Sequence, residues 1–144
     1  AVDKRGKLDM LRSLGADHVV DYLSEDFTER GERYDLILDV KTNRSPLAYL
    51  RALSPGGAYV TVGGAIARLL QAVVYAPYVA RLARRYVRVV ALKHNKDLAY
   101  MNGLFEAGKL RPVIQGPYAL ADLPEAFRLF GRGDQVGKII VTMA

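Results

Sequence analysis

The hydrophobic pattern alternates between short apolar runs and stretches with helical periodicity. Residues 34–40 and 58–62 are short runs rich in aliphatic and β-branched side chains, which is typical of strands buried on both faces of a parallel sheet. Between them, leucines recur at helical spacing over residues 46–53, and a Ser-Pro-Gly-Gly turn at residues 54–57 is expected to end that helix. The pattern therefore predicts a strand-helix-strand unit whose strands end at one edge of a parallel sheet.

The rest of the chain continues this alternation. We expect further strands at residues 1–3, 18–22, 87–92 and 138–143, and further helical segments at residues 8–14, 25–27, 65–85, 97–107 and 123–130. Pro77 is expected to break the long helical stretch, because proline lacks the amide that the helix requires. Strands that alternate with helices predict the α/β class.

Three residues are expected at the edge of the sheet where open α/β sheets bind ligands. Asp39 ends the first central strand, and Gly63 and Gly64 follow the second. Glycines there could let a ligand approach the backbone, or they could simply form a tight turn. Asp35 lies on the same face as Asp39 but on the same strand, so a catalytic pair is not predicted, and Asp39 is expected to bond local backbone.

Composition excludes several classes of protein. The chain has 144 residues, of which 51% are hydrophobic, enough for one ordinary core. It has no cysteine, which excludes disulfides and thiolate chemistry, and a cytoplasmic location is expected. The longest apolar stretch, residues 65–80, is interrupted by charged and polar residues and is not expected to cross a membrane.

The net charge of +6 raises the question of an anionic partner. Its densest positive patch is formed by Arg81, Arg84, Arg85 and Arg88. The patch could be a nucleic-acid surface, but no nucleic-acid-binding motif accompanies it, so we favour a solvated helix face.

Metal and hydrolase chemistry are not predicted. His18 and His94 are isolated in the sequence and lack the spacing of a metal-binding pair. The chain also has no Gly-x-Ser-x-Gly motif of the kind that holds a hydrolase nucleophile.

Five segments carry a resemblance to a known family. They are LRSLGADHVVDY (residues 11–22), YDLILDV (34–40), LSPGGAYVTVGG (53–64), LFEAGKLRPVI (104–114) and LPEAFRLF followed by GKIIV (123–141). In this order and spacing they resemble the carboxyl-terminal half of the medium-chain dehydrogenase/reductase superfamily, which includes the zinc-type alcohol dehydrogenases, and in particular its quinone oxidoreductase branch. The resemblance covers essentially the whole chain.

The resemblance implies a Rossmann-like parallel sheet flanked by helices. It implies a partial NAD(P)-binding domain at residues 1–115 and, at residues 116–144, a segment that returns to a catalytic domain. The Gly-x-Gly-x-x-Gly fingerprint would lie before residue 1, so we expect a fragment that lacks the first strand of the sheet. Catalytic residues and any zinc ligands would also lie upstream, and the isolated fragment is expected to be inactive.

The resemblance also implies residues on the adenosine side of the cofactor. Asp3 would accept from the ribose hydroxyls of NAD, whereas Lys4, Arg5 and Lys7 could neutralise the 2′-phosphate of NADP. The branch carries a Lys at the Lys7 position and a Tyr at the Tyr22 position, which favours NADP. Alternatively, the basic residues are a solvated helix start and Tyr22 is a packing residue.

On the nicotinamide side, the resemblance places Val62, Gly63 and Gly64 under the nicotinamide ribose. Gly137 and Lys138 match a family position whose basic residue reaches the cofactor pyrophosphate. The alternatives are a tight turn for the first group and an exposed strand-end lysine for the second.

We therefore expect part of an NAD(P)H-dependent oxidoreductase that transfers hydride to a quinone or an activated alkene, or acts on an alcohol or carbonyl substrate. The alternatives are a non-catalytic dinucleotide-binding regulatory module and a nucleic-acid-binding α/β domain. We also expect a homodimer, because the strand at residues 87–92 would be the last of its sheet and leave an unpaired edge. The apolar segment at residues 69–82 would support the same interface.

Overall fold

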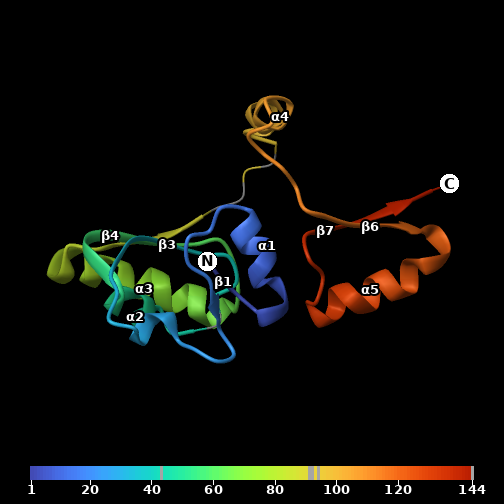
Figure 1. Ribbon diagram of the computed structural model, residues 1–144. Coiled ribbons are helices and arrows are strands. Elements are labelled where there is room, and N and C mark those ends of the chain that lie inside the picture. The colour runs from blue at the N-terminus through green and yellow to red at the C-terminus, as the bar shows by residue number, and fades with distance from the viewer. Residues whose placement is uncertain (43, 91–92, 94, 144) are drawn as a thin grey trace. The chain divides into compact units, whose positions relative to one another are not determined.

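The computed structural model describes residues 1–42, 44–90, 93 and 95–143 (Figure 1). By its contacts the chain forms two compact units, which are described separately. The first unit contains Ala1–Ser24 and Asn95–Ala144, and the second contains Glu25–His94. The division into domains at residue 115 that the resemblance implies stays a prediction.

The second unit contains the predicted strand-helix-strand core. Its elements are β3 (Tyr34–Asp39), α2 (Pro46–Arg51), β4 (Leu53–Thr61), α3 (Ile66–Ala83) and β5 (Tyr86–Val89), with a short 3-10 turn at Phe27–Glu29. The three strands form one parallel sheet in the order β3-β4-β5. The α/β prediction is thereby confirmed, and both helices connect parallel neighbours as crossovers.

The core of the second unit lies on one face of this sheet. Ile37 of β3 and Tyr59 of β4 pack there with Tyr49 of α2 and Ala72 of α3, all nearly inaccessible to solvent. The opposite face is more open, since Leu36 on β3 is 62% exposed. Side chains alternate between the two faces of a strand. Helices α2 and α3 therefore cover one face of the sheet and bury its side chains.

The predicted turn at residues 54–57 lies inside β4 and not before it. Tyr34 pairs with Leu53, but the next partners are Leu36 and Ala58, so the register shifts at this point. Gly56, with φ of 83°, takes a left-handed conformation that glycine adopts without strain. The glycine-rich sequence therefore forms a bulge within the strand and does not mark its start.

The break predicted at Pro77 is wrong. Helix α3 runs continuously from Ile66 to Ala83, with Pro77 inside it. Ala72 before the proline is fully buried, and Val79 after it packs against the same core. Contacts on both sides of Pro77 thus hold the two halves in one line, at the cost of one helical hydrogen bond.

The first unit contains two small parallel sheets and three α-helices among its described residues. Its elements are β1 (Val2–Asp3), a 3-10 turn (Arg5–Lys7), α1 (Leu8–Ser13), β2 (Val20–Asp21), α4 (Leu98–Glu106), β6 (Ile114–Ala119), a second 3-10 turn (Leu120–Asp122), α5 (Leu123–Arg132) and β7 (Lys138–Thr142). Strand β1 pairs with β2, and β6 pairs with β7.

Strand β6 was not predicted from the sequence. Gly116 and Pro117 argue against a strand, but they fall at a register shift between Gln115 and Tyr118, where a bulge tolerates both. Helix α5 then crosses back to β7 and ends at Gly133, whose φ of 68° is typical of a helix C-terminus. Among the described residues, no helix is long and apolar enough to span a bilayer.

Candidate functional site

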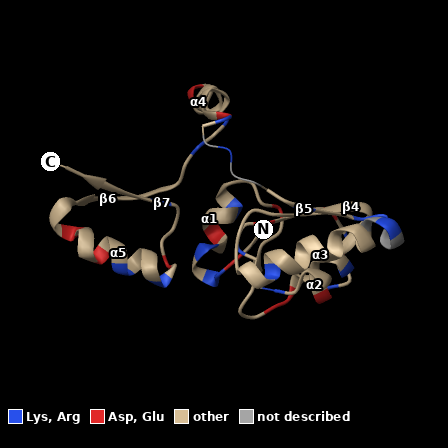
Figure 2. Ribbon diagram, turned by 180° about the vertical axis from the view of Figure 1, so that it is seen from behind, with Lys and Arg blue, Asp and Glu red and all other residues tan. Residues whose placement is uncertain are grey.

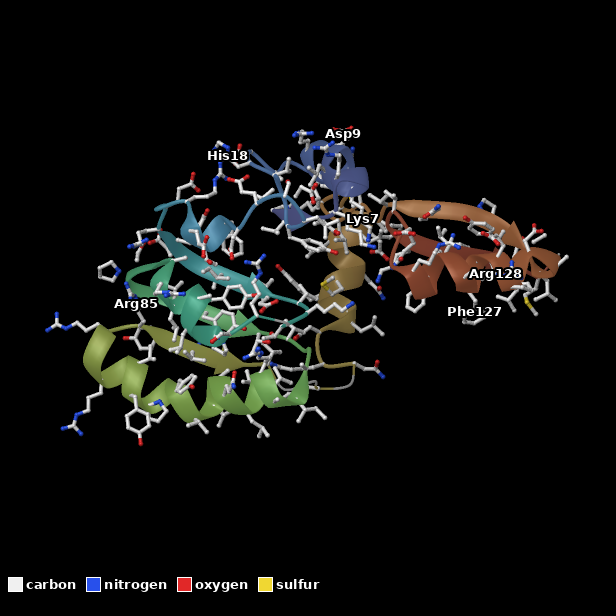
Figure 3. All side chains as sticks on the ribbon, turned by 90° about the horizontal axis from the view of Figure 1, so that it is seen from below. Lys7, Asp9, His18, Arg85, Phe127 and Arg128 are labelled. Carbon is white, nitrogen blue, oxygen red and sulfur yellow. The ribbon has the colours of Figure 1, made fainter. Side chains whose placement is uncertain are left out.

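The carboxyl end of β1 brings together three of the predicted cofactor residues. Asp3 pairs in register with Asp21 of β2, and its Oδ1 accepts from the Lys4 amide at 2.7 Å. The Lys7 ammonium lies 3.8 Å from the same oxygen, and its side chain is only 14% exposed (Figure 3). The Tyr22 amide donates to the Asp3 carbonyl at 3.3 Å. Asp3, Lys7 and Tyr22 therefore share one small area at a sheet edge.

The other two predicted basic residues differ in their availability. Lys4 Nζ lies 3.0 Å from Asp134 Oδ1 and donates to the Arg132 carbonyl at 3.1 Å, so its charge is already engaged. This hydrogen bond raises the pKa of Lys4 and lowers the pKa of Asp134. Arg5 Nε lies 3.8 Å from Asp21 Oδ2, but the Arg5 side chain is 86% exposed. Arg5 is thus the cation in this area with the most freedom to meet a phosphate.

In the second unit, the segments after β3 and β4 are joined through their backbones. The Val62 amide donates to the Asp39 carbonyl at 2.9 Å, and the Thr42 amide donates to the Gly63 carbonyl at 2.8 Å. The Ala65 amide returns a bond to the Thr42 carbonyl at 3.0 Å. These bonds fix the predicted nicotinamide loop at the carboxyl end of the sheet, where α/β folds bind ligands.

The two glycines of this loop have different surroundings. Gly64 has φ of 138°, and a methyl group added there would overlap the Thr42 backbone, with the Thr42 Cα only 2.8 Å away. A methyl group at Gly63 would meet nothing closer than the Val40 carbonyl oxygen at 3.8 Å. The tight-turn explanation therefore accounts for Gly64, and backbone approach by a ligand stays a prediction for Gly63.

The sequence analysis missed a buried group of hydroxyls beneath this loop. Thr42 Oγ1 lies 2.5 Å from Thr61 Oγ1 and 3.3 Å from the Tyr59 hydroxyl, and Tyr59 donates to Asp39 Oδ2 at 2.9 Å. Burial is the main cause that raises the pKa of Tyr59 to about 12. Burial and the nearby Asp39 carboxylate also raise the pKa of Tyr49, which stacks on Tyr59 with ring centroids 4.9 Å apart.

A signal for this group was present in the sequence. Tyr59 and Thr61 are two apart on a strand and so share its buried face, where polar side chains need partners. Asp39 does bond the local backbone, as predicted, through the Lys41 amide at 3.2 Å. Its second oxygen makes the cross-strand bond that sequence could not assign.

The remaining predicted pair, Gly137 and Lys138, lies at the start of β7 in the first unit. Gly137 has φ of 86°, and a methyl group there would overlap the Val113 carbonyl. The Lys138 amide donates to that same carbonyl at 2.7 Å, and the Lys138 residue is exposed. Gly137 therefore has a packing role, and the reach of Lys138 to a pyrophosphate stays a prediction.

The arginine patch is only partly a free surface. Figure 2 shows basic residues at the C-terminal end of α3. Arg81, Arg84 and Arg88 are exposed, but Arg85 turns inward and donates to the Leu53 carbonyl at 2.8 Å (Figure 3). One of the four arginines therefore bonds the backbone of β4 and is less available to a ligand, which weakens the case for a nucleic-acid surface.

The described side chains that could bind a metal ion lie apart from one another. Within the part of the chain that the structure describes, no three His, Asp or Glu side chains gather closely enough to hold a metal ion. His18 is exposed, and His94 lies outside the described residues.

Comparisons with known proteins agree on one family. The family described as zinc-binding dehydrogenase matches residues 14–141. The chain is 27% identical, over 98% of its length, to 2-methylene-furan-3-one reductase of Solanum lycopersicum, of which it covers 32%. It is 26% identical, over 94% of its length, to the chloroplastic NADPH-dependent alkenal/one oxidoreductase of Arabidopsis thaliana, of which it covers 31%.

A solved structure gives the same result. A protein of Sinorhizobium meliloti 1021 assigned to the alcohol dehydrogenases superposes with a TM-score of 0.72 at 27% identity, covering 97% of this chain and 42% of that one. The chain thus spans about a third of the length of the two curated relatives.

Proposed function

Because this chain belongs to the family of zinc-binding dehydrogenases, within the medium-chain dehydrogenase/reductase superfamily, we propose that it is the dinucleotide-binding part of an NAD(P)H-dependent oxidoreductase. The proposed reaction is hydride transfer to a quinone or an activated alkene. The bound nicotinamide would supply the hydride, and the protein would supply binding, orientation and exclusion of water. The observation that carries the proposal is the grouping of Asp3, Lys7 and Tyr22 at the carboxyl ends of β1 and β2.

Each unit, taken by itself, offers residues that suit part of a dinucleotide. In the first unit, Asp3 would accept from ribose hydroxyls, and Arg5 and Lys7 would face the adenosine phosphate. In the second unit, the open space over Gly63 would admit the nicotinamide ribose. Lys138 would reach the pyrophosphate from the start of β7.

We propose a modest preference for NADPH over NADH. Lys7 lies near the Asp3 carboxylate and reduces its repulsion of a 2′-phosphate, while the exposed Arg5 can bond that phosphate directly. A charged hydrogen bond of this kind contributes roughly 1.5 to 3 kcal/mol, which corresponds to at least tenfold in affinity.

Isothermal titration of the 144-residue chain with NADPH and NADH tests this preference. We expect Arg5→Ala to weaken NADPH binding about tenfold and leave NADH binding nearly unchanged. Arg12→Ala is the matched control, since Arg12 is an α1 cation that pairs only with Asp9 among the described residues. Equal affinity for both cofactors in the unmutated chain would refute the preference, and no binding of either would refute the proposed function.

The substrate class is supported by the names of the relatives, which are an alkenal/one oxidoreductase and a furanone reductase. We propose that the chain alone binds the dinucleotide but does not turn over an enone or a quinone. A non-catalytic sensor of NAD(P)H is the second candidate. An absorbance assay of the longest natural form of the protein, with NADPH and an enone, separates the two, because a sensor would bind without oxidising the cofactor.

We also propose a symmetric dimer formed through β5. Within the described chain, β5 pairs with β4 alone, so its other edge carries backbone groups that a second copy could bond. A cytoplasmic location is proposed on the absence of cysteine alone.

A further inference from the structure

A chain of four side chains connects the ends of β3 and β4 beneath the predicted nicotinamide loop. It runs from Thr61 to Thr42, from Thr42 to Tyr59 and from Tyr59 to Asp39, with distances of 2.5, 3.3 and 2.9 Å. Thr42 is 1% exposed, and Thr61 and Tyr59 are fully buried. Buried hydroxyls without partners would be costly, so this arrangement is strongly constrained.

The direction of these hydrogen bonds follows from the carboxylate at one end. An ionised Asp39 can only accept, so Tyr59 must donate to it. The Tyr59 oxygen can then accept from Thr42, and the Thr42 oxygen can accept from Thr61. The Thr61 proton has a second acceptor in the Gly63 carbonyl at 3.4 Å, so every hydroxyl proton in the chain has a partner, and each link polarises the next.

Thr42 occupies the centre of this chain and also holds the loop through its backbone. Its amide donates to the Gly63 carbonyl at 2.8 Å, and its carbonyl accepts from the Ala65 amide at 3.0 Å. It forms a parallel bridge to Gly64, whose missing side chain allows this close approach. Thr42 thus holds the loop by its backbone, while its hydroxyl anchors it to Tyr59 and Thr61 of β4. The Thr61 hydroxyl also reaches the Gly63 carbonyl, at 3.4 Å.

We propose that Thr42 is a positioning residue for the nicotinamide half of the dinucleotide. Its hydroxyl, bonded to Tyr59 and Thr61, anchors Thr42, and its backbone then holds the Val62–Gly64 segment in the shape that receives the nicotinamide ribose. This inference rests on the proposed function. Thr42 is only 1% exposed and would not touch the cofactor itself, so loss of its hydroxyl should loosen the loop and leave the adenosine-binding residues of the first unit unchanged.

The test compares Thr42→Val with Thr42→Ser in the 144-residue chain. Valine keeps the shape of threonine without the hydroxyl, whereas serine keeps the hydroxyl. Thr142→Val is a matched control, because the Thr142 hydroxyl donates to the Tyr118 carbonyl in the other unit. Two ligands are titrated: NADPH, and 2′-phospho-ADP-ribose, which lacks the nicotinamide.

We expect Thr42→Val to weaken NADPH binding about tenfold and to leave 2′-phospho-ADP-ribose binding within about twofold. Thr42→Ser should restore NADPH binding. Amide hydrogen exchange gives an independent measurement: exchange of the Ala65 amide should accelerate in Thr42→Val relative to the amides of β4.

Equal losses for both ligands, or no loss for either, would overturn the positioning role. Unchanged exchange at Ala65 would overturn the clamp itself. If the unmutated chain binds NADPH no more tightly than 2′-phospho-ADP-ribose, the loop does not bind the nicotinamide. The proposed dinucleotide function would survive that result. If it binds neither ligand, both the function and this inference fail.

Discussion

At the scale of single residues, two buried tyrosines both form the core of the second unit and link it to the end of β3. Tyr49 and Tyr59 stack at an interplanar angle of 13°, and Phe27 lies 6.1 Å from Tyr49 between ring centroids. Burial favours the neutral phenol, and this raises the pKa of Tyr59 from 10.0 to about 12. The same rings that form the core therefore bring the Tyr59 hydroxyl to the Asp39 carboxylate.

This pKa shift predicts a loss of stability at high pH. The folded state holds the Tyr59 proton more tightly than the unfolded state, so the stabilisation is complete below pH 10 and is lost as the pH rises toward 12. The lost free energy of unfolding should be about 2 kcal/mol. Urea unfolding between pH 8 and pH 12 measures it. Tyr59→Phe should make the decline shallower, and the remaining decline belongs to Tyr49, whose pKa burial also raises.

Tyr100→Phe serves as the control, because Tyr100 is 68% exposed on α4. An equally steep decline in Tyr59→Phe and in the unmutated chain would show that Tyr59 is not the responsible group.

At the scale of elements, the two glycines of the loop after β4 should differ in how much their substitution lowers the free energy of unfolding. Gly64→Ala should lower the free energy of unfolding by about 3 kcal/mol, because the added methyl group overlaps the Thr42 backbone in a left-handed conformation. Gly63→Ala should change it by less than about 1 kcal/mol, since its surroundings are open. Urea denaturation of both variants provides the comparison.

Gly103→Ala is the matched control for these substitutions. Gly103 lies inside α4, nothing would contact the new methyl group, and the helix should gain about 0.5 to 1 kcal/mol. Similar losses for Gly63→Ala and Gly64→Ala would contradict the distinction between them.

Helix α3 provides a second prediction at this scale. Pro77 is exposed within the helix and leaves one carbonyl without its helical donor. Pro77→Ala should therefore raise the free energy of unfolding by about 1 to 3 kcal/mol. Thermal unfolding checks this, with the exposed Val73→Ala change as the control on the same helix. A lower melting temperature in Pro77→Ala would indicate that the helix needs the bend or rigidity of proline.

At the scale of the whole molecule, dimerisation depends on the free edge of β5. The Val90 amide donates to the Thr61 carbonyl of β4 at 2.8 Å, so the Val89 amide points to the opposite side. Val89→Pro should remove an edge donor without breaking a bond to β4, and it should shift the chain toward monomer in sedimentation velocity at high micromolar concentration. Val89→Ala, which keeps the amide, should remain dimeric.

A monomeric sedimentation profile of the unmutated chain would contradict the dimer directly. A dimer that persists unchanged in Val89→Pro would place the interface elsewhere.

Local sequence patterns were sufficient to predict the α/β class, the central strand-helix-strand unit and the family. These depend on local periodicity and on the order of short motifs, which are properties of neighbouring residues. It also placed Asp3 and Gly63 at carboxyl ends of strands, because the direction of a parallel strand fixes where it ends.

The contacts between residues distant in sequence depended on the three-dimensional fold. The bulge at Gly56 and the continuity of α3 through Pro77 depend on partners distant in sequence, and these override local turn and helix-breaking signals. The engagement of Lys4 by Asp134 spans most of the chain. The link from Asp39 through Tyr59 to Thr42 exists because two parallel strands bring together side chains about twenty residues apart. The spacing of residues along the chain does not predict such contacts, because register and packing are set when the sheet and its helices assemble.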